Sequence, residues 1–350
     1  MRVGLLTGGG DCPGLNAVIR ALTKSLIHQC QAEVLGIEDG FAGLMDMRTR
    51  RLDWKAVSGI LATGGTILGT SNRCNPMQTQ ETSDRALANA AALGLDALVV
   101  VGGDGSMAIA DGLAQQGLSV VGVPKTIDND IAGCERSFGF DTAVAIVTEA
   151  LERVQTTGQS HGRVMIVECM GRYAGWVALQ AGIAGAADLI LLPEIDYALE
   201  TVVRVCHERE QLQRFSVICI GEGAKERGAA PSVAQRVCDS PDPVRLGGIA
   251  HRLRDQLQPR LRSEVRSTVL GHVQRGGPPT ANDRVLATQF GNMAARLVQD
   301  GNFGRMVTLA GGQVGSVALH SVAGHNRLLA ADDALLRTAR QIGIYFGDEA

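Results

Sequence analysis

The sequence predicts an α/β protein with mostly parallel sheets that are covered by helices on both faces. Short apolar, β-branched runs alternate with longer amphipathic stretches along the 350-residue chain. Glycine-rich turns follow several of these runs, and the 44 glycines exceed average usage. The length allows two domains of ordinary size or one large domain.

Composition argues against several classes of function. A net charge of −3 provides no basic field for nucleic acid or an anionic membrane, and aromatic residues at 3% argue against a base-stacking surface. The eight cysteines are scattered without a Cys-x-x-Cys pair, which is typical of reduced cytosolic thiols. No apolar run reaches the roughly 18 residues that a membrane span needs. We therefore expect a cytoplasmic protein that binds neither nucleic acid nor membrane.

The first strand, Val3–Leu6, leads into the glycine-rich turn Thr7–Asn16 and a helix to about Ile27. Such a turn presents main-chain N–H groups and a helix N-terminus to an anion. It is not a Walker A loop, because Leu15-Asn16 stand in place of Lys-Ser/Thr, and Pro13 occupies the slot of the last glycine of the dinucleotide fingerprint. Phosphate binding and a tight packing turn are both open interpretations.

A second glycine-rich loop, Gly64–Arg73, ends in an arginine, and the apolar strand Ala97–Val101 leads into Gly102–Ser106 and a helix over Met107–Gln115. Asp104 is a candidate ligand for hydrated Mg²⁺, with the Gly105 and Ser106 amides facing phosphates. The structural alternative is that Ser106 caps the helix and Asp104 complements its dipole. The two interpretations are compatible.

The third strand, Val120–Val123, leads into Pro124–Asp130, a stretch with a lysine, a threonine and two aspartates. Functional groups of open α/β sheets lie just past the carboxyl ends of strands. The alternative is a polar turn that caps a helix beginning near Asp141. Three strand–turn–helix units with anion-binding turns favour a functional site.

A second α/β series follows. Its strands are expected at Val164–Glu168, Leu189–Leu192, Val217–Ile220 and Thr268–Leu270. The expected helices are Asp84–Leu93 in the first half and Asp141–Gln155, Trp176–Ile183, Leu199–Leu212, Gly247–Leu257 and Asp332–Ile342 later in the chain. Basic residues lie at strand ends of this half: Arg163, Arg172, Arg266, His272 and Arg275. They predict a site for a small anionic substrate.

Phosphoryl transfer needs a phosphate cradle, a divalent cation, a carboxylate that accepts the hydroxyl proton and a cation on the transferring group. The chain offers a candidate for each: Gly10 with Gly105, Asp104, Asp128 and Arg172.

Five segments in order resemble those of the 6-phosphofructokinase family, and the resemblance covers nearly the whole chain. They are Gly-Gly-Asp-Cys-Pro-Gly-Leu-Asn, Gly-Gly-Asp-Gly-Ser, Pro-Lys-Thr-Ile-Asp-Asn-Asp, Met-Gly-Arg-Tyr-Ala-Gly and Leu-Gly-His-Val-Gln-Arg-Gly-Gly. The resemblance implies two doubly wound (Rossmann-like) domains with the active site in the cleft between them. The larger, donor-binding domain would be 1–139 plus 274–324, and the smaller, sugar-phosphate-binding domain 140–273 plus 325–350.

The resemblance also implies roles for individual residues. Contacts with the phosphoryl donor would come from Gly10, Arg73, Cys74, Gly103, Asp104, Gly105 and Ser106, with Asp104 on Mg²⁺. Fructose 6-phosphate would be held at its reacting end by Thr126, Asp128 and Asp130, and along the sugar by Met170, Gly171, Arg172, Glu222 and Arg275. Asp128 would take the C1-hydroxyl proton, and Arg172 would stabilise the transferring charge. The 6-phosphate would be bound by Arg163, Arg266 and His272, with both arginines supplied by a neighbouring subunit of a dimer or tetramer.

The residues that indicate the phosphoryl donor do not all agree. In the family, glycine after Gly-Gly-Asp is typical of members that use ATP, and lysine before Thr-Ile-Asp-Asn-Asp is typical of members that use pyrophosphate. This chain has Gly105 together with Lys125. Glycine leaves room for the α-phosphate of a nucleotide, and Lys125 adds a charge that need not exclude ATP, so ATP is the favoured donor and pyrophosphate the alternative. The loop at Asn72-Arg73 is one residue longer than in the common ATP-using bacterial members.

Two further classes compete with a kinase. A nicotinamide-dependent dehydrogenase would use a similar sheet, but no G-x-G-x-x-G fingerprint is present. A catalytically inactive sugar-phosphate sensor would keep the binding arginines; here every candidate catalytic position holds a competent residue.

Overall fold

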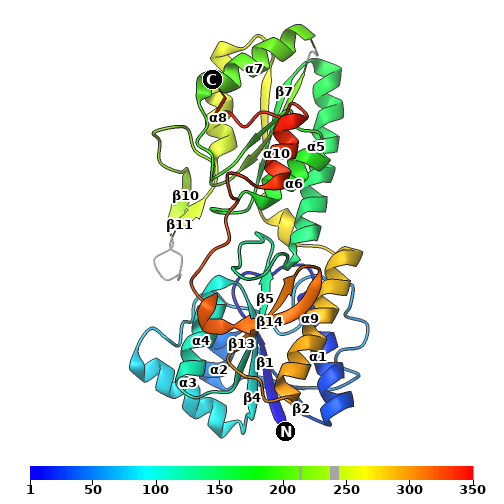
Figure 1. The fold of residues 1–350 in the computed structure, drawn as a ribbon, viewed down its shortest axis with the longest axis vertical. Coiled ribbons are helices and arrows are strands. Elements are labelled where there is room, and N and C mark those ends of the chain that lie inside the picture. Colours follow the sequence, from blue (N-terminus) through cyan, green and yellow to red (C-terminus); the bar gives the residue numbers. More distant parts are fainter. Residues whose placement is uncertain (213–214, 237–243, 350) are drawn as a thin grey trace. The chain divides into compact units, whose positions relative to one another are not determined.

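A computed structural model describes residues 1–212, 215–236 and 244–349. The chain divides into two compact units, which are described separately (Figure 1). Unit 1 includes Met1–Asp141 and Arg275–Arg327, and the described residues of unit 2 lie within 142–236, 244–274 and 328–349.

Unit 1 is built on an eight-stranded sheet with the order β14-β13-β5-β4-β1-β2-β3, and β6 pairs with β5. Its members are β1 (Arg2–Thr7), β2 (Glu33–Ile37), β3 (Thr49–Leu52), β4 (Ala97–Gly102), β5 (Val120–Thr126), β6 (Phe138–Gly139), β13 (Arg305–Ala310) and β14 (Gln313–Ala318). The central strands are parallel, whereas β3 and β14 add antiparallel edges. Strands β4 and β5 are buried along their whole length, and β4 is a continuous apolar run, as is typical of a parallel sheet covered on both faces.

Helices cover both faces of this sheet (Figure 1). They are α1 (Leu15–Cys30), α2 (Phe41–Asp46), α3 (Gln80–Ala92), α4 (Asp104–Gln115) and α9 (Ala281–Gln299), with the 3₁₀ turn η3 (Leu319–Ser321). Helices α1 and α9 lie side by side on one face, because Gly291 lets their backbones approach: a Cβ on it would lie 2.8 Å from the Val18 oxygen.

Unit 2 contains a parallel four-stranded sheet with the order β12-β7-β9-β8. Its strands are β7 (Val164–Cys169), β8 (Leu189–Leu191), β9 (Ser216–Gly221) and β12 (Val265–Val269), and β10 (Val233–Arg236) pairs with β11 (Val244–Leu246). The helices are α5 (Phe140–His161), which begins at the end of unit 1, α6 (Trp176–Ala184), α7 (Leu199–Leu212), α8 (Ile249–Leu257) and α10 (Ala334–Gln341), with the 3₁₀ turns η1 (Gln258–Arg260) and η2 (Gly271–Arg275). One core cluster joins the apolar faces of α7 and α8 to β7, β8 and β9.

The predicted fold class, α/β with mostly parallel sheets in two parts, is confirmed. Among the described elements, the sequence did not predict α2, α9, which has 19 residues, or the strands β2, β3, β6, β10, β11, β13 and β14. Strand β5 runs on to Thr126, so Pro124 to Thr126 belong to the strand and not to the loop that was expected. In the described residues no helix is long and apolar enough to cross a membrane.

Candidate active site

Three turns of unit 1 meet at the carboxyl edge of its sheet. Strands β1, β4 and β5 are neighbours and run parallel, so Gly8–Gly10, Gly103–Ser106 and Ile127–Asp130 leave the sheet from the same edge. The Gly8 N–H donates to the Val101 oxygen over 2.8 Å, which closes the first turn onto β4. The three strand ends that the sequence singled out therefore form one site.

The first turn is held by two cations. Lys125 donates from Nζ to the Gly10 oxygen, and Arg275 donates to the Asp11 oxygen over 3.0 Å. Lys125 is only 4% exposed, and burial lowers the pKa of its ammonium. Burial also raises the pKa of the neighbouring Cys12 thiol to about 12. Two positive groups at a glycine turn favour an anionic ligand.

The second turn begins helix α4 earlier than the sequence predicted. The helix starts at Asp104, and its N-cap is Gly103 without a side-chain hydrogen bond, so the alternative of a Ser106 cap is wrong. Ser106 is buried, and its hydroxyl oxygen lies 2.8 Å from the point where a Cβ on Gly8 would stand. Asp104 lies in the first helical turn, where the dipole stabilises a carboxylate. A Cβ on Gly105 would meet no atom within 4 Å, so this position is open.

The second glycine-rich loop packs against the first turn. Thr70 donates to the Gly9 oxygen over 2.5 Å, and Thr7 donates to the Gly69 oxygen over 2.7 Å. At the end of this loop Arg73 is exposed, and Cys74, which follows it, is half-buried. The structure thus brings this loop to the Gly8–Gly10 turn, with Arg73 exposed at its end.

Polar residues at the end of β5 are buried to an unusual extent. Thr126, Asp128, Asn129 and Asp130 are 9%, 4%, 3% and 8% exposed. The Asp128 N–H donates to the Thr126 hydroxyl over 3.0 Å, which fixes the turn. Asp128 Oδ1 is buried and has no hydrogen-bond partner. Buried polar atoms are nearly always paired, so this oxygen calls for an explanation.

In unit 2 the carboxyl edge brings a second set of predicted residues together. The Arg172 N–H donates to Glu222 Oε1 over 3.1 Å, and the Met170 N–H donates to Gln274 Oε1 over 3.2 Å. Gly171 and Arg172 adopt positive φ values of 145° and 51°. The loop Met170–Arg172 is therefore a sharp turn held by neighbouring side chains. His272 is exposed, one residue into η2.

Arg163 and Arg266 lie elsewhere. Arg163 directly precedes β7 and Arg266 is the second residue of β12, at the amino ends of parallel strands, whereas Arg172 and His272 follow carboxyl ends. A strand of this length spans about 20 Å, so treating all these basic residues as one group at strand ends was wrong for a single chain. Both arginines pair with Glu264, which accepts from Arg163 over 2.5 Å.

The carboxylates of the site fit a weakly held, hydrated cation. In the residues that the structure describes, no group of three or more His, Cys, Asp or Glu side chains could hold a metal ion. Mg²⁺ usually binds one or two carboxylates and completes its shell with water and substrate phosphates. Asp104, beside the open position at Gly105, fits this requirement.

Two buried or half-buried side chains that bind main-chain groups of unit 2 were not predicted. Gln274 is fully buried and joins Met170 to the Gly271 oxygen, to which it donates over 3.0 Å. Glu194 accepts from the Gly175 N–H over 2.9 Å and from the Leu329 N–H over 3.0 Å. Gln274 lies inside the motif Leu-Gly-His-Val-Gln-Arg-Gly-Gly, and Glu194 closely follows an expected strand, but nothing in the sequence indicates their partners.

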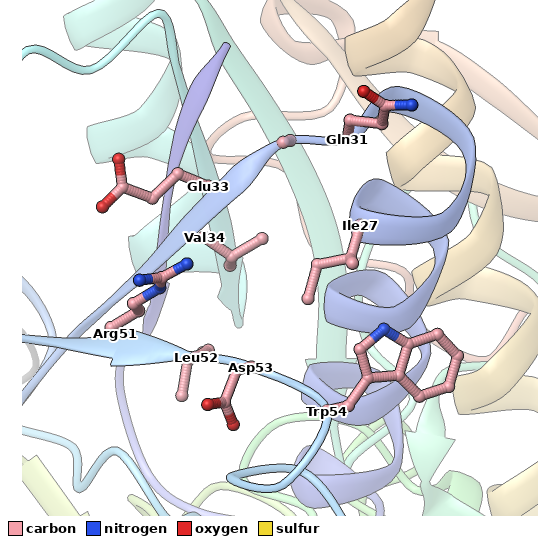
Figure 2. A pocket seen from close by; sticks show the side chains of 9 residues that line it. Ile27, Gln31, Glu33, Val34, Arg51, Leu52, Asp53 and Trp54 are labelled. Atoms are coloured by element: carbon pink, nitrogen blue, oxygen red, sulfur yellow. The ribbon is translucent and has the colours of Figure 1, made fainter.

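A cavity of about 360 Å³ lies at the opposite edge of the unit 1 sheet, near the start of β2 (Figure 2). Its lining includes Ile27, Arg51 and Trp54, and no predicted site residue. The Lys24 ammonium lies over the ring of Trp54, 4.4 Å from the ring centroid, in a cation–π contact.

Known proteins resemble this chain over nearly its whole length. Residues 2–298 match the family model described as phosphofructokinase. An "ATP-dependent 6-phosphofructokinase 2" of Clostridium perfringens is 46% identical over 360 residues, covering 99% of this chain and 98% of the relative. A "Pyrophosphate--fructose 6-phosphate 1-phosphotransferase" of Streptomyces coelicolor is 45% identical, covering 99% and 100%.

Among solved structures, the T-state phosphofructokinase of Pichia pastoris superimposes with a TM-score of 0.82 at 31% identity. The match covers 92% of this chain and 35% of that one, so the chain spans about a third of the yeast protein.

Proposed function

The chain belongs to the phosphofructokinase family, and from this premise we propose that it transfers the terminal phosphoryl group of ATP to the C1 hydroxyl of fructose 6-phosphate. The product is fructose 1,6-bisphosphate, an intermediate of glycolysis. The observation that carries the proposal is Asp128 Oδ1, a buried carboxylate oxygen without a hydrogen-bond partner. A substrate hydroxyl that donates its proton to this oxygen accounts for it.

In the proposed reaction Asp128 accepts the C1-hydroxyl proton while the hydroxyl oxygen bonds to the terminal phosphorus. The bond from that phosphorus to the bridging oxygen breaks in line, and the nucleoside diphosphate leaves. Thr126 holds the Asp128 main chain over 3.0 Å and, with Asp130, orients the reacting end of the sugar. Arg172 and Lys125 neutralise charge on the transferring group.

On the donor side, phosphates would contact the Gly10 turn, Arg73, Cys74 and the first turn of α4 from Gly103 to Ser106. The family's kinase activity implies a divalent cation, and we propose Mg²⁺ on Asp104. When bound, the cation would neutralise charge on the phosphate oxygens.

On the sugar side, Met170, Gly171, Glu222 and Arg275 would contact the ring and its hydroxyls, and His272 the 6-phosphate. Arg163 and Arg266 lie at the amino ends of their strands, remote from His272 at the carboxyl edge of the same sheet. Their contribution to the 6-phosphate site is therefore best explained by a second subunit. We propose a cytoplasmic homo-oligomer, a dimer or tetramer, whose sites are shared between subunits.

Pyrophosphate is the second candidate donor. Lys125 stands at the Gly10 turn, and a relative at 45% identity is named for pyrophosphate. Against it, Gly105 adds neither bulk nor charge at the proposed donor site. Identity does not separate the two donors, since relatives named for ATP reach 48% and those named for pyrophosphate 47%.

The test is an initial-rate assay with Mg²⁺ and fructose 6-phosphate, in which ATP, ADP and pyrophosphate are offered separately. We expect turnover with ATP, and a loss of about 10²- to 10⁴-fold in Asp128→Ser with fructose 6-phosphate binding retained. Asp141→Ser is the matched control, because Asp141 already pairs with Arg136 at 3.2 Å. Turnover with pyrophosphate alone would move the proposal to the second donor. Binding without turnover would favour a sensor, and binding of NADH a dehydrogenase.

A further inference from the structure

The turn that carries Asp128 and Asp130 contains a strained residue between them. Asn129 has a φ of 55°, the left-handed region that non-glycine residues rarely adopt. Such a conformation persists only where the surroundings hold it. Its direction decides where both neighbouring carboxylates point, so the contacts that stabilise Asn129 control the geometry of the proposed base.

One set of these contacts is local. Asn129 donates from Nδ2 to the Glu135 oxygen over 3.2 Å and accepts from the Ser137 N–H over 3.1 Å. Ser137 in turn donates to the Thr126 oxygen over 2.9 Å. These bonds close the segment 126–137 into a loop, but none of them reaches the main-chain oxygen of Asn129.

That oxygen is bound by a residue almost two hundred positions later. Arg327 donates from Nη1 to the Asn129 oxygen over 3.2 Å and to the Glu135 oxygen over 3.1 Å. The Arg327 N–H donates to the Asp130 oxygen over 2.7 Å, and Ile131 forms an antiparallel bridge with Asn326. The guanidinium thus joins the two ends of the loop, while the main chain of the same residue holds Asp130.

We infer that Arg327 is a positioning residue for Asp128 and Asp130. It acts through the main chain of Asn129, because one nitrogen of its guanidinium, Nη1, donates to both the Asn129 and the Glu135 oxygens. This inference rests on the proposed function, because it assigns Arg327 to the geometry of the same base. It involves no contact with the substrate.

The test compares Arg327→Ala with Arg327→Lys and with a matched control. Arg305→Ala removes another half-buried arginine of unit 1 that binds main chain and hydroxyl, at 2.6 and 2.7 Å to Ser316, away from the loop. We expect Arg327→Ala to lower kcat by about tenfold to a hundredfold, the scale of a misplaced catalytic group, with the donor KM changed less than about twofold. Arg327→Lys is expected to recover part of kcat, and Arg305→Ala to keep it.

A second readout is independent of turnover. Hydrogen exchange in the ligand-free protein is expected to speed up in the peptide covering 127–137 in Arg327→Ala and to stay unchanged there in Arg305→Ala. If the wild-type protein turned over no donor, the proposed function would fail while this exchange readout still decided whether Arg327 holds the loop. Unchanged exchange, or an equal fall of kcat in both alanine variants, would overturn the inference.

Discussion

The buried ammonium of Lys125 donates a hydrogen bond to the main-chain oxygen of Gly10, the glycine turn at which the donor is proposed to bind. The lysine is therefore already held at the turn, at a site that also receives Arg275 through Asp11. With the donor bound as proposed, its charge would lie near phosphate oxygens, which both ATP and pyrophosphate possess.

Replacement of Lys125 by methionine tests which donor depends on this charge. Methionine keeps most of the buried volume and removes the ammonium. Because pyrophosphate has no nucleoside for further contacts, we expect Lys125→Met to lower any pyrophosphate activity at least about tenfold more than the ATP activity, the scale of one charged hydrogen bond. The measurement is kcat/KM for both donors. Equal losses would mean that Lys125 supports the turn rather than the donor.

Substitutions of two glycines are expected to have opposite consequences. A Cβ on Gly105 would meet nothing within 4 Å, whereas a Cβ on Gly223 would stand 1.9 Å from the Arg172 oxygen. Gly105→Ala is therefore expected to leave the melting temperature within a few degrees of the wild type. Gly223→Ala is expected to displace the loop Met170–Arg172 and raise the KM for fructose 6-phosphate. A Gly105→Asp variant adds charge without a steric clash in the free protein, and its ATP KM is expected to rise. An unchanged ATP KM would contradict the assignment of Gly105 to the donor site.

The thiols provide a test of the donor site that does not need turnover. Cys30 and Cys74 are half-buried, whereas Cys12, Cys134, Cys169, Cys206 and Cys219 are buried. Burial raises the pKa of Cys12 and of Cys206 to about 12, so their reactive thiolate fraction near pH 8 is negligible. The pKa of Cys74 is also raised, first by burial and then by Asp46, so its labelling is expected to accelerate with rising pH.

Peptide mass spectrometry after brief maleimide treatment at pH 7 and pH 8.5 measures this order. We expect Cys30 and Cys74 to be modified first and ATP with Mg²⁺ to protect Cys74 alone. Cys238 lies outside the described residues, and its peptide is scored separately. Modification of Cys74 that ATP leaves unchanged would remove this residue from the proposed donor site.

Elements with a continuous apolar run or a clear amphipathic period were the ones that the sequence could predict. Strand β4 reads as an unbroken apolar run because neighbouring strands and helices cover it completely. Helix α9 was missed because Gly291, a poor helix former, lies in its middle. A glycine stands there because the backbone of α1 packs against it, and no local sequence pattern reveals that contact.

The same limit applies to the candidate site. Motifs identified the turns, since each follows an apolar run directly. Arg163 and Arg266 were grouped with residues at the carboxyl edge of the sheet, although they lie at its amino edge. Strand boundaries, direction and pairing register decide the edge, and only the folded structure shows them. Arg327 carries no local motif at all, because its partners Asn129 and Glu135 are distant in sequence.

Arg163 and His272 lie at opposite edges of the unit 2 sheet, which leads to a prediction about active sites shared between subunits. If the 6-phosphate site combines His272 of one subunit with Arg163 and Arg266 of another, two inactive variants can complement each other. We expect Asp128→Ser and the double variant Arg163→Ala/Arg266→Ala each to lack activity as homo-oligomers. Co-expressed, they can form sites that join an intact Asp128 to intact arginines, and activity is expected to reappear.

Separate affinity tags on the two variants allow the mixed oligomer to be purified and its specific activity compared with that of each parent. Asp128→Ser mixed with a second Asp128 variant, Asp128→Asn, is the control, because no arrangement of those subunits restores the base. Recovery confined to the arginine mixture would confirm a shared site. A mixed oligomer as inactive as both parents would mean that each chain completes its own site, and that Glu264 holds Arg163 and Arg266 for structural reasons alone.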